Sequence, residues 1–284
     1  MALPEAHLVL ADGTRFRGVS VGAARSTAGE AVFTTGMTGY QEVLTDPSYC
    51  GQIVTMTAPQ IGNTGINRED DETERPFVSG FVMRELSPMA SNWRSTESLN
   101  AYFERLGIVA LSEVDTRSLT RHIRDHGAQM AAMGTESPDT LADMAKAAAP
   151  MEGRDLTGEV TTSKAYTWTE NSGAWSPEAK DNAGLHVVAY DFGIKRNILR
   201  CLADTGCRVT VVPARTTADE ALAMGPDGIF LSKWPRRPGG GGLRRSDRAR
   251  CSARSRSLAS ASATKSSPSP WAARRTSCPL VTAG

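Results

Sequence analysis

Apolar runs and helical spacings alternate between residues 186 and 232. Three short apolar or β-branched runs there are typical of strands buried on both faces of a parallel sheet. Two segments between them carry apolar side chains at helical spacing. The strands are predicted at residues 186–192, 208–213 and 228–232, and the helices at residues 195–205 and 218–224. This alternation predicts a right-handed βαβ arrangement, with a site at the carboxyl ends of the strands, immediately after Ser232.

The first half of the chain contains several short apolar or β-branched runs, with four predicted helices among them. Strands are predicted at residues 8–16 (a hairpin closed by Asp12-Gly13), 29–35, 52–57, 80–83 and 108–111, and helices at 41–44, 95–105, 115–124 and 138–149. Residues 36–49 and 59–65 are dense in Gly, Thr, Tyr, Ser and Asn, and residues 69–75 are expected to form a solvated acidic loop. This composition is compatible with a turn-rich β domain or with a surface that positions a small polar ligand or a partner.

A stretch of weak periodicity separates the two halves. We expect an N-terminal domain at residues 1–152, a connector at 153–184, the start of an α/β domain at 185–232 and a tail at 233–284. The connector holds Trp168 and Trp175, which predicts that it packs against a domain.

Length and composition fit a chain with two cores. The 284 residues are 40% apolar, and no apolar run approaches the roughly 20 residues that span a bilayer. The N-terminus lacks the basic and apolar regions of a signal peptide. None of the five cysteines forms a C-x-x-C pair. A reduced, cytoplasmic protein without a membrane segment or a cysteine-based metal site is therefore expected.

Charge divides unevenly along the chain. Twelve of the 32 basic residues but only one of the 31 acidic residues, Asp247, follow Ser232. The tail is rich in Ser, Ala, Arg and Pro with few large apolar residues, which predicts a disordered basic segment. Its aromatic residues are Trp234 and Trp271 alone, and it carries no recognition fold, so nucleic-acid binding is not expected.

The predicted helix at residues 115–124 is basic. Its arginines lie three and four residues apart on one face, which favours a solvated helix face over an anion site. His122 and His126 are four residues apart, a spacing that can hold a metal. No third ligand is evident in the sequence, so no metal site is expected.

Several long motifs resemble the small, glutamine-hydrolysing subunit of carbamoyl-phosphate synthase. They lie at residues 37–49 (MTGYQEVLTDPSY), 59–63 (PQIGN), 115–117 (DTR), 160–162 (VTT), 188–193 (VAYDFG), 195–197 (KRN) and 227–232 (DGIFLS). The resemblance runs from about Leu8 to Ser232. It implies an α/β fold with an N-terminal β/β/α small-subunit domain. A truncated class I glutamine amidotransferase domain with a flavodoxin-like parallel sheet would follow, and then the disordered basic tail.

The same resemblance implies a chemistry. In this family a Cys-His-Glu triad hydrolyses glutamine, and the ammonia passes to a large synthetase subunit that docks on the N-terminal domain. Ser48 stands where the family has a glutamine-contacting serine. The implied partners are the large subunit and glutamine. No cofactor is expected in this subunit, and ATP and Mg²⁺ would be used by the large subunit.

The sequence departs from the family after Ser232. The family continues Asn-Gly-Pro-Gly-Asp-Pro, whereas this chain has Lys233 followed by Trp-Pro-Arg-Arg-Pro. The nucleophile motif Gly-Ile-Cys-Leu-Gly-His-Gln is absent, and no histidine follows His186. Cys251 and Cys278 have neither a strand nor a nucleophile elbow around them. We therefore expect the catalytic triad to be missing from the chain as printed.

A change of reading frame accounts for this departure. Residues 233–238 can be encoded so that removal of the first base gives Asn-Gly-Pro-Gly-Asp. Residues 258–265 can be encoded so that reading from the third base gives Gly-Ile-Cys-Leu-Gly-His-Gln. The two motifs need different frames, so at least two insertions or deletions are implied. Two functions follow as alternatives: an amidotransferase subunit with a scrambled C-terminus, or a non-catalytic docking partner of the large subunit.

Overall fold

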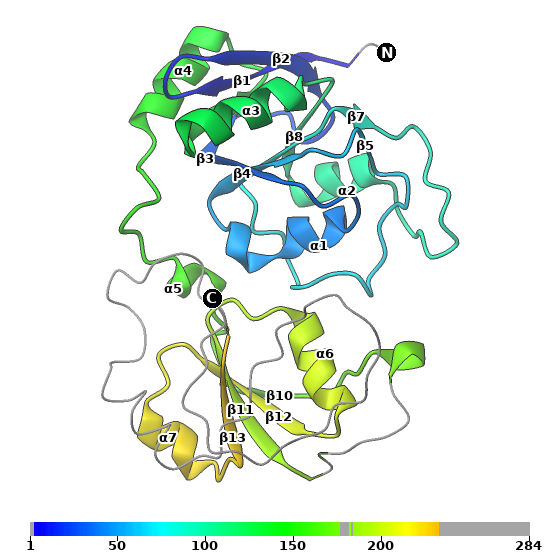
Figure 1. Ribbon diagram of the computed structural model, residues 1–284, viewed down its shortest axis with the longest axis vertical. Coiled ribbons are helices and arrows are strands. Elements are labelled where there is room, and N and C mark those ends of the chain that lie inside the picture. The colour runs from blue at the N-terminus through cyan, green and yellow to red at the C-terminus, as the bar shows by residue number, and fades with distance from the viewer. Residues whose placement is uncertain (1–2, 177–181, 183, 233–284) are drawn as a thin grey trace. The chain divides into compact units, whose positions relative to one another are not determined.

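The computed structural model describes residues 3–176, 182 and 184–232. The chain divides into two compact units between Arg154 and Asp155, and each unit has its own sheets and helices (Figure 1). The expected basic tail, with Cys251 and Cys278, lies outside the described residues. Among the described residues, no helix combines the length and the apolar character that crossing a lipid bilayer requires.

Unit 1 is built on a closed seven-stranded barrel in the order β1-β2-β8-β6-β4-β3-β9. The strands are β1 (Glu5–Leu10), β2 (Arg15–Ser20), β3 (Thr27–Thr34), β4 (Gln52–Met56), β6 (Gly80–Val82), β8 (Val109–Ser112) and β9 (Gln129–Gly134). Strands β3, β4, β6 and β8 pair in parallel, and β9 closes the barrel by pairing antiparallel with β1 and β3. The mixed α/β character is confirmed, but the strands form one closed barrel in place of the expected β/β/α layers.

The barrel interior follows from side-chain alternation. One hydrophobic cluster takes residues from all seven strands, so it is the interior; Leu119 and Ile123 of α3 (Thr116–His126) join it. Alternate residues of the same strands face outward, as the two-residue period of a strand requires. Ile53 of β4, for example, lies in the interior cluster, whereas Val54 lies in a second cluster.

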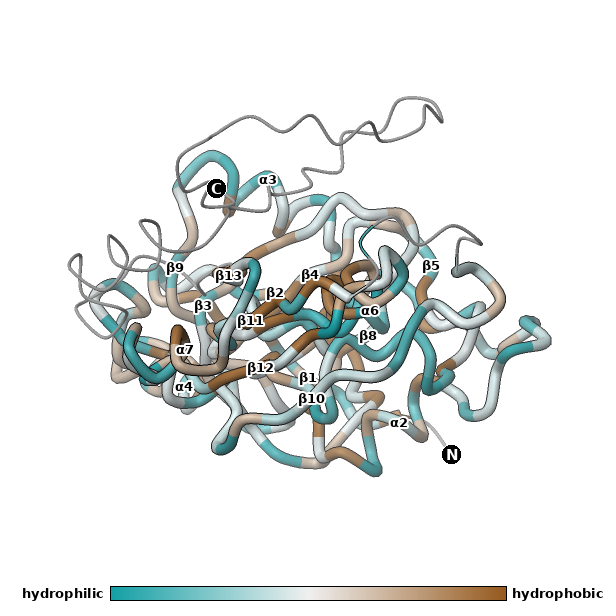
Figure 2. Tube along the Cα trace, turned by 90° about the horizontal axis from the view of Figure 1, so that it is seen from below, coloured by the Kyte–Doolittle hydropathy of each residue, from teal (hydrophilic) through white to brown (hydrophobic). Residues whose placement is uncertain are grey.

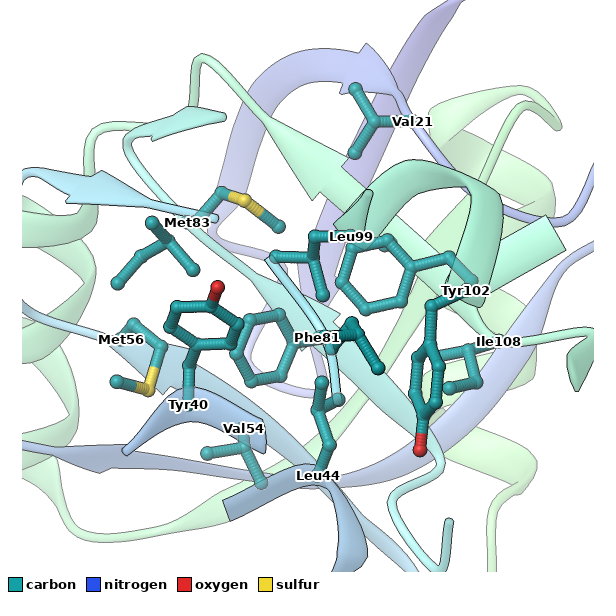
Figure 3. Packing of buried hydrophobic residues seen from close by; sticks show 14 of the residues in the cluster. Val21, Tyr40, Leu44, Val54, Met56, Phe81, Met83, Leu99, Tyr102 and Ile108 are labelled. Atoms are coloured by element: carbon teal, nitrogen blue, oxygen red, sulfur yellow. The ribbon is translucent and has the colours of Figure 1, made fainter. Parts of the chain in front are cut away.

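The second cluster packs helices α1 (Tyr40–Thr45) and α2 (Leu99–Leu106) onto the outside of the barrel (Figure 3). A third, smaller cluster packs α4 (Pro138–Ala147) on β1 and β9. Helix α2 begins four residues later than predicted. The reason is local: Ile66 N–H donates to the Glu97 carbonyl, and the Thr96 amide and hydroxyl donate to the Ile66 carbonyl.

Unit 2 contains a four-stranded sheet in the order β10-β12-β11-β13. Its parallel strands are β11 (His186–Asp191), β12 (Arg208–Pro213) and β13 (Gly228–Leu231), close to their predicted positions. Helix α6 (Arg196–Asp204) packs on one face through Leu199, and α7 (Ala218–Ala223) packs on the other through Ala221. In Figure 2 much of the trace along β11 and β12 has the brown colour of hydrophobic residues, as expected of strands covered on both faces.

Part of the expected connector belongs to this sheet. Strand β10 (Tyr166–Trp168) pairs antiparallel with β12, and Trp168 packs against the cluster beneath α6. Asp204, at the end of α6, accepts hydrogen bonds from the Ser172 amide, the Ser172 hydroxyl and the Ser176 hydroxyl. Trp175 is exposed. Residues 166–168 therefore add an edge strand to unit 2, and residues 172–176 form a segment that is hydrogen-bonded to the end of α6.

Candidate functional site

The carboxyl ends of β11 and β13 form the first candidate site, in unit 2. The strand order β12-β11-β13 means that the chain leaves β11 toward one side and returns on the other. Ligands of open α/β sheets bind at such a switch point. Asp191 ends β11, and Ser232 follows β13. The Ser232 hydroxyl accepts a hydrogen bond from the Phe192 amide at 2.9 Å, which ties the two strand ends together.

Asp191 organises the turn after β11. Its Oδ1 accepts the Gly193 and Ile194 amides at 2.9 and 2.8 Å, and its Oδ2 accepts the Thr162 amide at 2.7 Å. Burial raises the pKa of the Asp191 carboxyl, and the three amide hydrogen bonds act in the opposite direction. The carboxylate thus fixes the backbone at this edge, and residue 162 is held beside it.

We expect Asp191→Asn to destabilise unit 2 by about 2 kcal/mol, because an amide has only one acceptor oxygen. The NH₂ group of the introduced asparagine would then lie opposite the Thr162 N–H, and because both are donors this hydrogen bond would be lost. Urea unfolding of the variant and the parent chain measures the loss. Asp143→Asn, at an exposed position of α4, is the matched control and should change little. Equal effects of the two substitutions would contradict this role for Asp191.

Ser48, the second candidate, lies in unit 1. It belongs to the short 3-10 helix at Pro47–Tyr49, whose cap is Asp46. The Asp46 carboxylate accepts the Ser48 amide at 2.8 Å, and Pro47 restricts the first position of the turn. Ser48 itself is half-buried. Its backbone is therefore fixed by its neighbours, and its contact with glutamine stays a prediction.

A loop at residues 67–75 packs on the helix that precedes Ser48. Buried Gln41 of α1 donates to the Asn67 carbonyl and to Asp71 at 2.7 Å, and its oxygen accepts the Asn67 amide at 3.0 Å. The Glu72 amide donates to Thr45, and Glu72 is buried. The prediction of a solvated acidic loop is thus wrong for Glu72, which is buried where the loop hydrogen-bonds to α1, whereas Glu69, Glu74 and Arg75 are exposed as expected.

In unit 2 the described histidine and cysteines do not come together at the carboxyl ends of the strands. His186 is buried at the amino end of β11, opposite the candidate edge, and its Nε2 contacts Thr210 Oγ1 at 2.8 Å. Cys207 is buried and Cys201 is exposed on α6. Within the described residues, no three His, Cys, Asp or Glu side chains lie close enough together to hold a metal ion. Arg117, Arg121 and Arg124 of α3 are exposed, as a solvated helix face would be.

His122 contacts the carboxylate of Asp12. Its Nε2 lies 2.6 Å from Asp12 Oδ2, and its ring stacks on His126 with centroids 4.3 Å apart. Burial opposes ionisation of Asp12, but hydrogen bonds from Gln129, Thr14 and His122 outweigh it and lower the pKa of this carboxyl well below its usual range. Asp12 therefore links the β1–β2 turn to α3 and β9.

The lowered pKa of Asp12 predicts a pH dependence. A carboxyl with a depressed pKa contributes stability that is present above its unfolded value, about 3.9, and is lost as the pH falls toward the folded value. The stability difference between the parent chain and Asp12→Asn should therefore shrink below about pH 4. Urea unfolding at pH 6, 5, 4 and 3 measures it, with Asp143→Asn as the control. A difference that stays constant over this range would contradict the assignment.

Sequence reasoning placed a site after Ser232 but did not single out Asp191 or Thr162. The available signal was the Asp-Phe-Gly sequence that ends an apolar run, since an acid there must find donors at the strand edge. Thr162 lies 29 residues before Asp191 in the chain. No local pattern shows that these two residues meet.

Comparisons with known proteins match each unit separately. Residues 8–133 match the family model "Carbamoyl-phosphate synthase small chain, CPSase domain", and residues 188–254 match "Glutamine amidotransferase class-I". The second match continues beyond Ser232, where the resemblance was expected to end. A parallel sheet with helices on both faces is consistent with that second family.

Curated relatives extend the likeness across both units. The chain is 52% identical over 246 residues to the carbamoyl phosphate synthase small chains of Salmonella typhimurium and Escherichia coli K12, covering 83% of this chain and 64% of each relative. It is 53% identical over 243 residues to that of Photobacterium profundum, covering 82% of this chain and 63% of the relative. The chain thus spans less than two thirds of these relatives. An aminopeptidase from Aneurinibacillus sp. strain AM-1 matches at a TM-score of 0.29 and 11% identity, too low to indicate a shared fold.

Proposed function

Because this chain belongs to the family of carbamoyl phosphate synthase small chains, we propose that it derives from the glutamine amidotransferase subunit of that synthase. The supporting observation is the succession of two matches, each inside a different compact unit: the small-chain domain lies in unit 1, and the amidotransferase match begins in unit 2. In this role unit 1 docks on a large synthetase subunit, and unit 2 begins the glutamine site.

The reaction proposed for the intact subunit is hydrolysis of the glutamine side-chain amide. A cysteine thiolate adds to the amide carbon, and a histidine gives the leaving nitrogen its proton, so ammonia departs and a thioester forms. Water then cleaves the thioester to glutamate and regenerates the thiol. The large subunit would consume the ammonia, with ATP and Mg²⁺ bound there.

This chain contributes only part of that machinery. The edge formed by Asp191, Phe192 and Ser232 in unit 2 is ordered by the hydrogen bonds described above. Contact of Ser48 with glutamine is a separate proposal, which rests on the family resemblance of residues 37–49. The printed sequence has no histidine after His186 and no nucleophile motif. We propose that shifts of reading frame after Ser232 removed these groups, and that the chain as printed is catalytically inactive.

The second candidate function is that of a docking partner without glutaminase activity. The separate match of unit 1 to the small-chain domain favours it, because docking requires none of the residues after Ser232. In a complex of this kind the large subunit would depend on free ammonia.

Co-elution tests the docking that both candidates share. The full chain and a purified large synthetase subunit from Escherichia coli are passed through a sizing column separately and together. A shared earlier peak containing both chains is expected. Separate elution at micromolar concentrations would overturn the docking proposal. Carbamoyl phosphate formation from ammonium chloride, but not from glutamine, by the co-eluting complex is the expected second result.

A further inference from the structure

Unit 1 contains an open cleft of about 650 Å³ between residues 66–71, residues 93–97 and α2. The two loops are held in place around it. The Ile66 amide donates to the Glu97 carbonyl at 2.9 Å, and Arg94 donates to Glu69 and Asp70 at 2.8 and 2.7 Å. The cleft lies wholly within unit 1, and none of its lining residues was given a role in glutamine hydrolysis above.

The carboxylates around the cleft already have partners. Glu69 pairs with Arg94, and Glu97 takes two hydrogen bonds from Arg105 at 3.0 and 2.7 Å. Asp71 accepts the Gln41 amide at 2.7 Å. Arg94 and Arg105 are therefore already paired with carboxylates, which leaves Arg68 as the arginine of the cleft without an ion pair among the described residues.

The polar atoms of three other groups on the cleft have no hydrogen-bond or ion-pair partner among the described residues, although the Arg105 guanidinium lies 5.3 Å from the Tyr102 ring centroid. Arg68 is exposed and has no hydrogen bond or ion pair with any residue that the structure describes. The Trp93 side chain is 90% exposed. Tyr102 is only 3% exposed, lines the cleft, and has no hydrogen-bond partner for its hydroxyl within the described part of the chain.

The orientation of Tyr102 distinguishes it from the other aromatic residues of the cluster. Its ring packs beside Ile108, and its hydroxyl points away from the packed side chains (Figure 3). Burial, with a smaller contribution from Asp71, raises the pKa of this phenol, so the hydroxyl keeps its proton and can donate. The Tyr102 hydroxyl is not among the fully buried unpartnered atoms, and at the open cleft it can donate to an acceptor atom of a ligand.

We propose that this cleft binds a small planar aromatic acid. The ring stacks on the Trp93 indole, the acid group pairs with the Arg68 guanidinium, and the Tyr102 hydroxyl donates to an acceptor atom of the ligand. An inorganic anion could pair with Arg68 but would not stack on the Trp93 indole. A neutral aromatic would use the indole alone.

Binding of benzoate to the full chain tests the proposal, with ligand-observed saturation-transfer NMR as the readout. Cyclohexanecarboxylate keeps the charge without the aromatic ring, and benzamide keeps the ring without the charge. Saturable benzoate binding is expected, with weaker binding of both analogues. Arg68→Gln should weaken it roughly tenfold or more, because a charge-assisted contact is lost. Trp93→Ala and Tyr102→Phe should each weaken it severalfold.

The control variant is Arg124→Gln, which removes an exposed arginine of α3 away from the cleft. It should bind benzoate like the parent chain. All substituted side chains are exposed, except that Tyr102→Phe keeps the buried ring, so thermal unfolding should show an intact unit 1. Absence of saturable binding would overturn the proposal. So would equal binding of cyclohexanecarboxylate, or retention of benzoate affinity in Arg68→Gln.

Discussion

The chain as printed should release no ammonia from glutamine above the uncatalysed rate, with or without a large synthetase subunit. The physical reason is the absence of a paired thiolate and imidazole at the edge of unit 2. Among the described cysteines, Cys207 is buried, Cys201 lies on the exposed face of α6, and Cys50 is buried in unit 1, while His186 is at the opposite end of β11. Loss of a nucleophile or its base lowers turnover by factors on the order of 10⁶ in enzymes with such pairs.

A repaired chain provides the matched comparison. Residues 233–284 would be replaced by a reading that restores Asn-Gly-Pro-Gly-Asp-Pro after Ser232 and the Gly-Ile-Cys-Leu-Gly-His-Gln motif, followed by the C-terminal segment of the Escherichia coli relative. We expect glutamine-dependent ammonia release from this chain, measured by a coupled glutamate dehydrogenase assay. Changing the restored cysteine to serine should abolish it. Ammonia release by the printed chain at a comparable rate would contradict the proposed loss of the site.

Codon usage tests the proposed origin independently of activity. The nucleotides that encode residues 230–284 either contain the synonymous choices that the shifted reading requires or they do not. If they match over both motifs, the frame changes are supported. Systematic use of other codons would make the basic tail a genuine product of its gene, and the docking function would then be favoured.

Phe81→Ala should destabilise unit 1 by about 3–5 kcal/mol, the largest stability effect that we expect of a single substitution here. Phe81 is fully buried on β6 (Figure 3). Its ring centroid lies 5.7 Å from that of Phe103. The cluster contains parts of the barrel and of two helices, so it cannot collapse around the cavity without moving several elements. A domain is typically stable by only about 5–15 kcal/mol, so the loss is a large fraction of the total.

The control for Phe81 is Phe77→Ala. Phe77 is half-buried, lies outside the clusters and has the Arg75 guanidinium 4.5 Å from its ring centroid. Its removal should lower the free energy of unfolding by about 1 kcal/mol, the scale of a partly exposed cation–π contact. Urea unfolding followed by circular dichroism measures both variants. A difference of less than 1 kcal/mol between them would contradict the assigned role of Phe81.

The sequence predicted the elements of unit 2 well because each is defined by its own neighbours. Strands β11 and β12 are buried runs of apolar and β-branched residues, and α7 has a capping box in which Thr217 and Glu220 bond to each other's backbone. Strand β10 was missed because it is three residues long, with Tyr166 and Thr167 exposed, so no apolar period marks it. Its pairing with β12 is a tertiary contact.

The barrel of unit 1 could not be predicted from local pattern. Its strands were found, but closure depends on contacts such as His7 with Gly134, which lie at opposite ends of the unit. Parallel pairing of β3 with β4, and of β6 with β8, likewise leaves no mark in the order of residues. Similarly, Gln41 looked like one polar residue of a short helix, and its role appears only when the loop at residues 67–75 packs on it.

The place of β9 in the barrel has a consequence for synthesis of the chain. Strand β9 is the last strand of unit 1 to be made, and it bonds to β1 and β3, which are the first and third. The ring of hydrogen bonds cannot close until residue 134 has left the ribosome, but it needs no residue that comes later. A change of reading frame after Ser232 thus lies nearly a hundred codons beyond the last strand of the barrel. Such a change would leave an already closed barrel intact while altering whatever is synthesised after β13.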